Sequence, residues 1–194
     1  MYDRESLSLW SNLTGEAVVG KRAASSSRLR MLPLTLTTWK AWREQHPDTT
    51  VMKPDRGAER RFGFSYQEGA ADERREGVSF PVWQRSTLLD DKAEIFALRL
   101  DGQSKAYPLE RLEPGLLIED RVGETELLLV VDEAGTVRAS ERGDVRFTAT
   151  AAGEVVDSEG RRWQVSEQEL VPPSGSGLEP RARLAGHVAF WFGL

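Results

Sequence analysis

The residues best suited to chemistry form a charged cluster at the start of the 194-residue chain. Asp3, Arg4 and Glu5 are adjacent and precede an apolar stripe. A carboxylate beside a guanidinium keeps its charge, so this cluster could perform acid–base chemistry or clamp a polar ligand through Arg4. In the structural alternative, Asp3 accepts backbone hydrogen bonds in a turn while Arg4 and Glu5 pair with neighbours. We favour the structural interpretation.

A second candidate lies in the sequence QHPDT, where His46 and Asp48 flank Pro47. The two could form a histidine–carboxylate dyad or supply two metal ligands. Zinc takes three or four protein ligands, and the chain has only two histidines and no cysteine. We therefore expect no metal and no cofactor, and expect His46 to end a helix, where the dipole favours a donor. His187, in GHVAFWF, is expected to be a half-buried imidazole with a hydrogen-bond partner.

Six tryptophans are many for a chain of this length. Flat aromatic rings could stack on sugars, but each buried Trp also stabilises a core by about 4 to 6 kcal/mol. Trp10, Trp39, Trp163 and Trp191 recur at matching places in two parts of the chain, which favours core packing. Trp83 lies outside this repetition and is predicted to be exposed, so it joins Arg4 as a candidate ligand-binding residue.

One short helix is predicted near residues 38–46, in TTWKAWREQHPDT. Thr37 or Thr38 can cap it, Trp39 and Trp42 fall on one face, and Pro47 ends it. Upstream, residues 13–20 read as a turn and a short strand. Residues 28–36 alternate like another strand, although Pro33 argues against full pairing there.

The second half is dense in predicted strands. They are EIFALRL, SKAYPLERL, GLLIEDRVG, ETELLLVV, GTVRASERG and VRFTATAAG, and Asp101-Gly102 forms a turn after the first. Short strands separated by glycine-containing turns indicate antiparallel sheets rather than βαβ units. Residues 53–78 are rich in Arg, Glu, Gly and Asp and read as a polar connecting loop.

Two parts of the chain resemble each other. MYDRESLSLWSNL compares with VVDSEGRRWQVSE, and RLRMLPLTLTTWKAW with GLEPRARLAGHVAFWF. We therefore predict an α+β fold, mainly β, of two related antiparallel β-rich lobes at 1–52 and 79–194. The first lobe lacks a counterpart of the strands at 93–131 and is expected to be incomplete. An exposed apolar edge and self-association would follow.

Composition excludes several classes of function. The net charge of -5 argues against nucleic-acid binding. No apolar run approaches the length of a membrane span, and Met1 is not followed by the pattern of a signal peptide. Without cysteine there can be no disulfide, thiolate metal site or cysteine nucleophile.

Three segments carry a family resemblance: MYDRESLSLWSNLTGEAVVG, LTLTTWKAWREQHPDT and DGQSKAYPLERLEPGLLIEDRVG. They resemble blocks of the bacterial and archaeal family known as domain of unknown function 3179. In that family a Cys-containing motif precedes the first block, whereas Met1 here already lies inside it. The resemblance thus implies the later portion of such a protein and, since many relatives look exported, an extracytoplasmic location. It supplies an architecture and no mechanism.

Three functional hypotheses remain open. The leading one is a non-enzymatic binding or interaction domain, because no nucleophile–base or metal constellation is evident. The second is an enzyme with a polar site between the lobes, around Asp3, Arg4, Glu5 and His46. The third is a truncated family member without the ancestral activity. Substrate and partner stay unknown.

Overall fold

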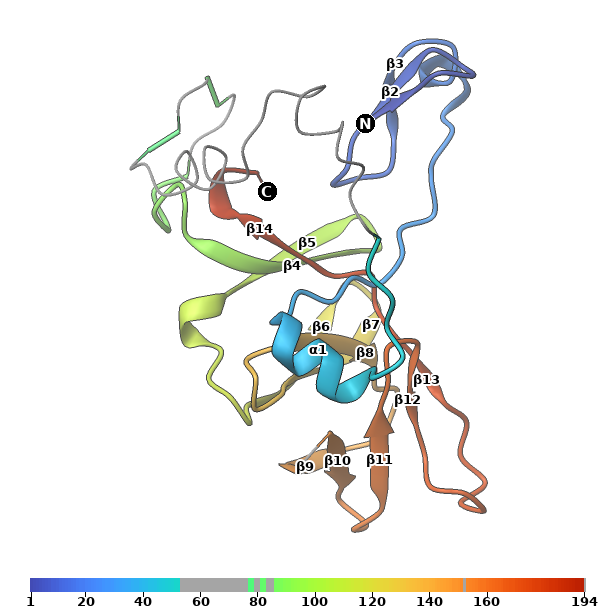
Figure 1. Cartoon of the computed structure of the whole chain (residues 1–194), viewed down its shortest axis with the longest axis vertical. Helices are drawn as coiled ribbons and strands as arrows, with labels where there is room; N and C mark the ends of the chain where they lie inside the picture. Colours follow the sequence, from blue (N-terminus) through green and yellow to red (C-terminus); the bar gives the residue numbers. More distant parts are fainter. Residues whose placement is uncertain (53–76, 79–80, 83–85, 152, 194) are drawn as a thin grey trace.

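The computed structural model describes residues 1–52, 77–78, 81–82, 86–151 and 153–193 (Figure 1). The predicted loop at 53–78 therefore lies almost wholly outside the described residues, and so does Trp83. The described part is mainly β, with several antiparallel sheets and one α-helix, which confirms the predicted fold class. The division into two lobes stays a prediction.

The elements follow one another along the chain in a simple order. The strands are β1 (Tyr2–Asp3), β2 (Ser8–Trp10), β3 (Ala17–Val19), β4 (Glu94–Leu100), β5 (Gln103–Pro108), β6 (Leu117–Val122), β7 (Thr125–Val131), β8 (Val137–Glu141), β9 (Phe147–Ala151), β10 (Glu154–Asp157), β11 (Arg162–Val165), β12 (Glu169–Val171), β13 (Arg181–Ala182) and β14 (His187–Phe190). The helices are α1 (Trp39–Gln45) and the 3-10 turns η1 (Ala23–Ser25), η2 (Leu109–Arg111) and η3 (Trp191–Gly193).

Three of the four sheets stack into the body of the molecule around β7. The sheets have the strand orders β14-β4-β5, β6-β7-β8 and β13-β12-β11-β10-β9. In β7, Leu127, Leu129 and Val131 pack toward β4 and β5, whereas Leu128 and Val130 pack toward Trp163 on the other side. A strand buried on both faces reads as an unbroken apolar run, which is what TELLLVV is.

The N-terminal sheet, β1-β2-β3, stands apart from this body at the upper right of Figure 1. A long connection runs down from it to α1, which lies over β6, β7 and β8 in the same view. The N-terminal sheet also carries many of the exposed apolar side chains, including Tyr2, Leu9 and Val19.

Helix α1 begins and ends where the sequence predicts. The Thr38 hydroxyl accepts a hydrogen bond from the Ala41 amide at 3.2 Å, which satisfies one of the free donors of the first turn. At the other end the His46 amide donates to the Trp42 carbonyl at 2.8 Å, and Pro47 follows. The cap fixes which side chains α1 presents to the body.

Two sequence predictions about the first 40 residues are wrong. Residues 29–36 form no ladder, because no strand of the described part of the chain pairs with them; Arg28 makes an isolated bridge, to Glu16. Trp39 is 53% exposed rather than packed in the core, since it is the first residue of α1, and the Arg43 guanidinium lies over its ring at 6.0 Å. Trp10 and Trp163 are buried as predicted, and Trp191 is partly buried.

Candidate functional site

A cleft of about 1250 Å³ opens between α1 and the C-terminal sheets. One wall is the inner side of α1 with His46, and the floor is the end of β7. The opposite wall comes from the β9–β10 turn and from residues 164–168, which leave β11. Four segments far apart in the sequence thus enclose one space.

A buried arginine joins these walls. Arg138, on β8, is only 5% exposed. Its guanidinium donates to Asp132 at 2.8 Å, to Glu167 at 2.8 and 3.1 Å, and to the Gln45 side chain of α1 at 3.3 Å. Thr35 also donates to Glu167. We call Gln45, Asp132, Arg138 and Glu167 the Arg138 network.

The two carboxylates of the network are held ionised. Burial alone would raise the pKa of Asp132, but hydrogen bonds from the Thr136 amide and from Arg138 outweigh it and lower that pKa. The pKa of Glu167 is lowered in the same way, by Thr35 and Arg138 against the effect of burial. Ion pairs of this buried kind can specify the local conformation of a protein. The network therefore fixes the geometry of the cleft.

A second buried arginine backs the same carboxylate. Arg183 lies 3.5 Å from Glu167 and also donates to the Ser166 carbonyl at 3.3 Å. Burial, with a smaller effect from the nearby charge of Arg138, lowers the pKa of Arg183. Glu167 thus stands between two guanidinium groups, which anchors the loop that forms one wall of the cleft.

The rest of the lining is rich in hydrogen-bond acceptors. Glu44, Glu133 and Glu154 add carboxylates, and Gln164 and Gln168 add amides. Arg138 is the one Lys or Arg among the described lining residues, and its charge is already matched. Such a surface suits a ligand that carries donors, such as hydroxyl or ammonium groups.

His46 is the predicted candidate that does line the cleft. Its ring packs against Trp42 with centroids 4.1 Å apart, and the Trp42 indole donates to Thr49 at 2.9 Å. The Nε2 atom of His46 is buried and has no hydrogen-bond partner within the described structure. Asp48, its partner in the proposed dyad, is exposed and does not line the cleft.

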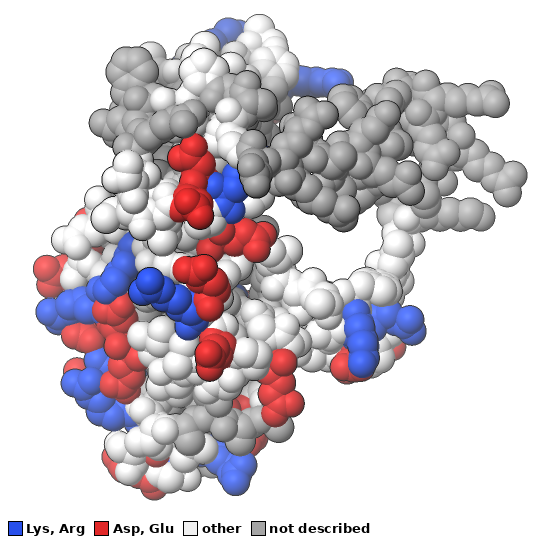
Figure 2. All heavy atoms as spheres, turned by 90° about the vertical axis from the view of Figure 1, so that its left-hand side faces the viewer, with Lys and Arg blue, Asp and Glu red and all other residues white. Residues whose placement is uncertain are grey.

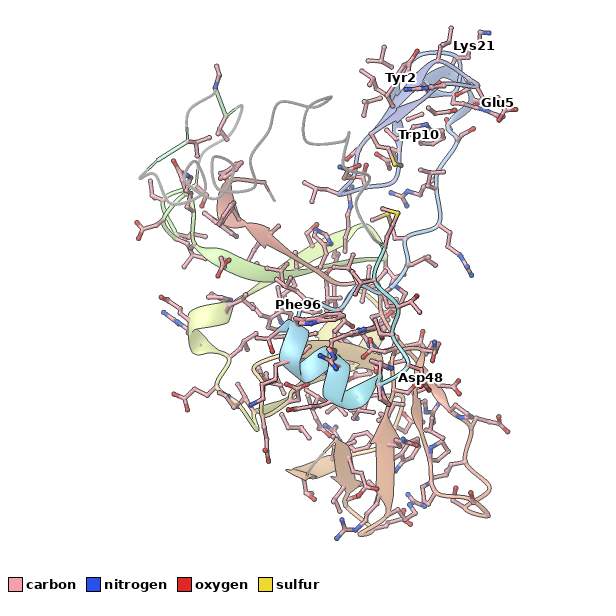
Figure 3. The ribbon with its side chains drawn as sticks, in the orientation of Figure 1. Tyr2, Glu5, Trp10, Lys21, Asp48 and Phe96 are labelled. Carbon is pink, nitrogen blue, oxygen red and sulfur yellow. The ribbon has the colours of Figure 1, made fainter. Side chains whose placement is uncertain are left out.

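The cluster of Asp3, Arg4 and Glu5 lies elsewhere. Figure 3 shows Glu5 at the N-terminal sheet and Asp48, two residues after His46, near the end of α1. Asp3 accepts hydrogen bonds from Ser6 and, at 2.9 Å, from the Glu5 amide, and these hold the pKa of Asp3 below its ordinary value. Arg4 and Glu5 are exposed. The structure does not bring the four residues of the predicted interlobe site together.

Asp3 has a close counterpart in the second half of the chain. Asp157 accepts hydrogen bonds from the amides of Glu159 and Arg161, from the Arg161 guanidinium at 2.7 Å and from the Trp163 indole at 2.9 Å. Each aspartate ends the first strand of an antiparallel hairpin whose second strand carries a buried tryptophan, Trp10 or Trp163. The repetition seen in the sequence therefore corresponds to a repeated local structure.

A pair of serines extends this likeness. The Ser11 hydroxyl accepts hydrogen bonds from the amides two and three residues later, and so does that of Ser166. Both serines follow the tryptophan and start a turn into the third strand. Both hydroxyls therefore serve to hold turns.

Sequence reasoning missed most of the lining. Arg138 and Glu167 belong to a strand and a loop that nothing in the local pattern connects with α1. One signal was present: VRAS in β8 places a charged side chain at an interior position, which requires a buried partner. The identity of that partner depends on tertiary structure.

Surface charge is mixed on the face shown in Figure 2. Acidic side chains follow one another down its middle, and lysines and arginines gather mainly to one side among further acidic groups. No group of three or more His, Cys, Asp or Glu side chains in the described part of the chain is arranged to hold a metal. None of the described helices is long and apolar enough to cross a membrane.

Comparison with known proteins assigns the family. The family model described as "Protein of unknown function (DUF3179)" matches residues 1–193. The chain belongs to this family. Neither a curated protein nor a solved structure matches it. Because the DUF3179 description gives no activity, the function has to be argued from the cleft.

Proposed function

We propose that this DUF3179 protein is a non-enzymatic binding domain whose ligand occupies the cleft beside α1. The observation that carries the proposal is the Arg138 network. Four segments meet at one buried guanidinium, which holds the walls of an open cleft of about 1250 Å³ in fixed positions. A pre-formed cleft in which a few polar groups converge is the usual form of a small-molecule site.

Several polar side chains of the cleft already have hydrogen-bond or ion-pair partners, and this favours binding over catalysis. Asp132, Arg138 and Glu167 pair with one another. Ser166, the hydroxyl in the cleft wall, donates to the Glu169 carbonyl at 2.7 Å while it accepts two amides. A nucleophile needs a free general base within reach. Ser166 is the one hydroxyl among the described lining residues, and its proton is already donated to Glu169, whereas acceptors such as Glu44 and Glu133 suit recognition of a ligand with donors.

The test is a fragment screen by NMR on the full chain. We expect fragments with hydroxyl or ammonium groups to shift the Trp42 indole and the Gln45 and Gln168 side-chain amides. Ala134→Trp places a large ring on the cleft wall and should weaken binding by at least about tenfold. Ala24→Trp, at another exposed alanine, in η1 and outside the cleft lining, is the matched control and should leave binding unchanged.

Two results would overturn the proposal. Fragments that shift only residues of the N-terminal sheet would place the site elsewhere. Fragments that bind Ala134→Trp and Ala24→Trp equally well would show that the cleft is not used.

The enzyme alternative rests on His46 in this structure. Its unpartnered Nε2 lies in the cleft wall, but Asp3, Arg4 and Glu5 do not line that cleft. A reaction at this place would therefore have His46 as the base and be lost in His46→Gln while binding persists. The further alternative, a family member without the ancestral activity, is compatible with the same binding site.

A further inference from the structure

An extended segment between the N-terminal sheet and α1 has the form of a strand that pairs with no strand of the described chain. From residue 31 to residue 38, odd-numbered residues are half-buried and even-numbered residues are exposed. This period of two is that of a β-strand. Yet no backbone hydrogen bond joins residues 30–37 to any other residue that the structure describes.

The odd-numbered face is fastened to the body. Thr35 donates to Glu167, and the Thr37 hydroxyl accepts a hydrogen bond from Thr136 at 2.8 Å. The opposite face presents a row of leucines, with Leu32 63%, Leu34 56% and Leu36 56% exposed. The segment is thus held with its leucines outward, and its main-chain groups have no partner among the described residues.

Pro33 leaves one edge of this segment competent for pairing. In a strand, the N–H and C=O groups of alternate residues point to opposite edges. Residues 32, 34 and 36 supply donors and acceptors to one edge without interruption. The other edge includes Pro33, which has no N–H, and prolines occur in strands where no ladder bond is required.

We propose that two copies of the chain pair through this segment, antiparallel about a two-fold axis at Leu34. In this register Leu34 faces Leu34 of the second copy, and Leu32 faces Leu36. Each of these pairs is of the hydrogen-bonded type and exchanges two N–H···O bonds. Pro33 then faces Thr35 at a non-hydrogen-bonded position, where its missing donor costs nothing.

The segment selects its own copy because its register is self-complementary. Leucine meets leucine at every paired even position, and the odd residues stay bound to their own body. An unpaired strand edge is a template for another strand, and an isologous contact of this kind closes as a dimer instead of growing. This dimer gives a defined contact to the self-association expected from the sequence. It does not depend on the proposed ligand site.

Cross-linking tests the register, because the chain has no cysteine of its own. In the proposed dimer the two Leu34 Cα atoms lie about 5.5 Å apart, within disulfide range. Leu34→Cys should therefore form a covalent dimer on mild oxidation. The two Leu36 positions lie roughly 13 Å apart, so Leu36→Cys alone should remain uncross-linked, whereas a mixture of Leu32→Cys and Leu36→Cys should cross-link. Equal cross-linking of Leu34→Cys and Leu36→Cys would overturn the register.

Sedimentation of the cysteine-free chain tests the association itself. We expect a monomer–dimer equilibrium, with Leu34→Pro raising the dissociation constant by at least about tenfold because the central pair loses its donors. Leu34→Val keeps the donor and an apolar, strand-forming side chain, so it should still dimerise. A chain that stays monomeric at every concentration refutes the pairing. The partner of the leucine edge would then be a strand of a different protein. Equal dimerisation of the proline and valine variants refutes it as well.

Discussion

At the scale of single residues, the two related aspartates differ in how deeply they are held. Asp157 is 1% exposed and receives two side-chain donors, from Arg161 and Trp163, whereas Asp3 is partly exposed and bonds mainly within its own turn. Asp157→Ala leaves the Trp163 indole and the Arg161 guanidinium without their acceptor, so we expect it to lower the free energy of unfolding by about 3 kcal/mol. Asp3→Ala should have a clearly smaller effect. Urea denaturation of both variants measures the difference, and equal losses would contradict it.

His187 gives the protein a pH dependence in the mildly acidic range. Burial lowers the pKa of His187, and its Nε2 has no partner within the described structure, contrary to the partnered imidazole expected from the sequence. Below the unfolded pKa of about 6.5, the unfolded chain binds a proton that the folded chain resists. The stability is therefore fully present above pH 6.5 and falls as the pH drops below it.

The prediction is checked by thermal unfolding of the wild type and of His187→Gln between pH 7.5 and pH 5.5. The midpoint of the wild type should fall over this range, and that of His187→Gln should change less. The buried carboxylates do not interfere, because their lowered pKa values place their titration further into acid. An identical slope in both proteins would assign the pH dependence to other groups.

Few of the individual site residues could be predicted from the sequence. His46 was identifiable because a histidine at a helix end is visible in the local pattern. Gln45, Arg138 and Glu167 come from a helix, a strand and a loop, and only the packing of sheets around β7 brings them together. Their types are ordinary at each place, so no local pattern marks them as a set.

At the scale of elements, the chain just before β14 passes so close to side chains of the paired strand β4 that a glycine is required there. A Cβ atom at Gly186 would lie 2.2 Å from the Phe96 ring and 3.0 Å from Leu98. Because both side chains are fully packed in the core, Gly186→Ala should destabilise the protein by about 1 to 3 kcal/mol. Gly193→Ala is the control, since nothing lies within 4 Å of a Cβ atom there. Thermal unfolding of the two variants compares them, and equal midpoints would show that the contact can relax.

Elements were more predictable than contacts, for a physical reason. Strands β4 to β9 were found because each is bounded by glycine or by a turn such as Asp101-Gly102, where both residues have positive φ. Helix α1 was found because Thr38 and Pro47 mark its ends. Residues 28–36 have the same alternation, but a ladder also needs a neighbour, and whether one is present is not written in the segment itself.

At the scale of the whole molecule, the Arg138 network is one of the places where the N-terminal part of the chain is attached to the sheets. Gln45 bonds to Arg138, and Thr35 bonds to Glu167 beside it. Removing the guanidinium in Arg138→Met takes the ion-pair partner from Asp132 and leaves Arg183 as the one guanidinium beside Glu167, which should cost about 3 kcal/mol. The loss should be insensitive to salt, because the pair is shielded from solvent.

Hydrogen exchange localises this attachment. In Arg138→Met, the amides of α1 that bond to Thr38 and Trp42 should exchange faster than in the wild type, because the helix loses its anchor to β8. The amides of β2, in the separate N-terminal sheet, should be unaffected. The control is Arg28→Met, which removes an exposed pair with Glu16 and should change stability by no more than about 0.5 kcal/mol. If α1 and β2 respond alike in Arg138→Met, the network stabilises the chain as one cooperative unit, and the cleft wall is not held separately by Arg138.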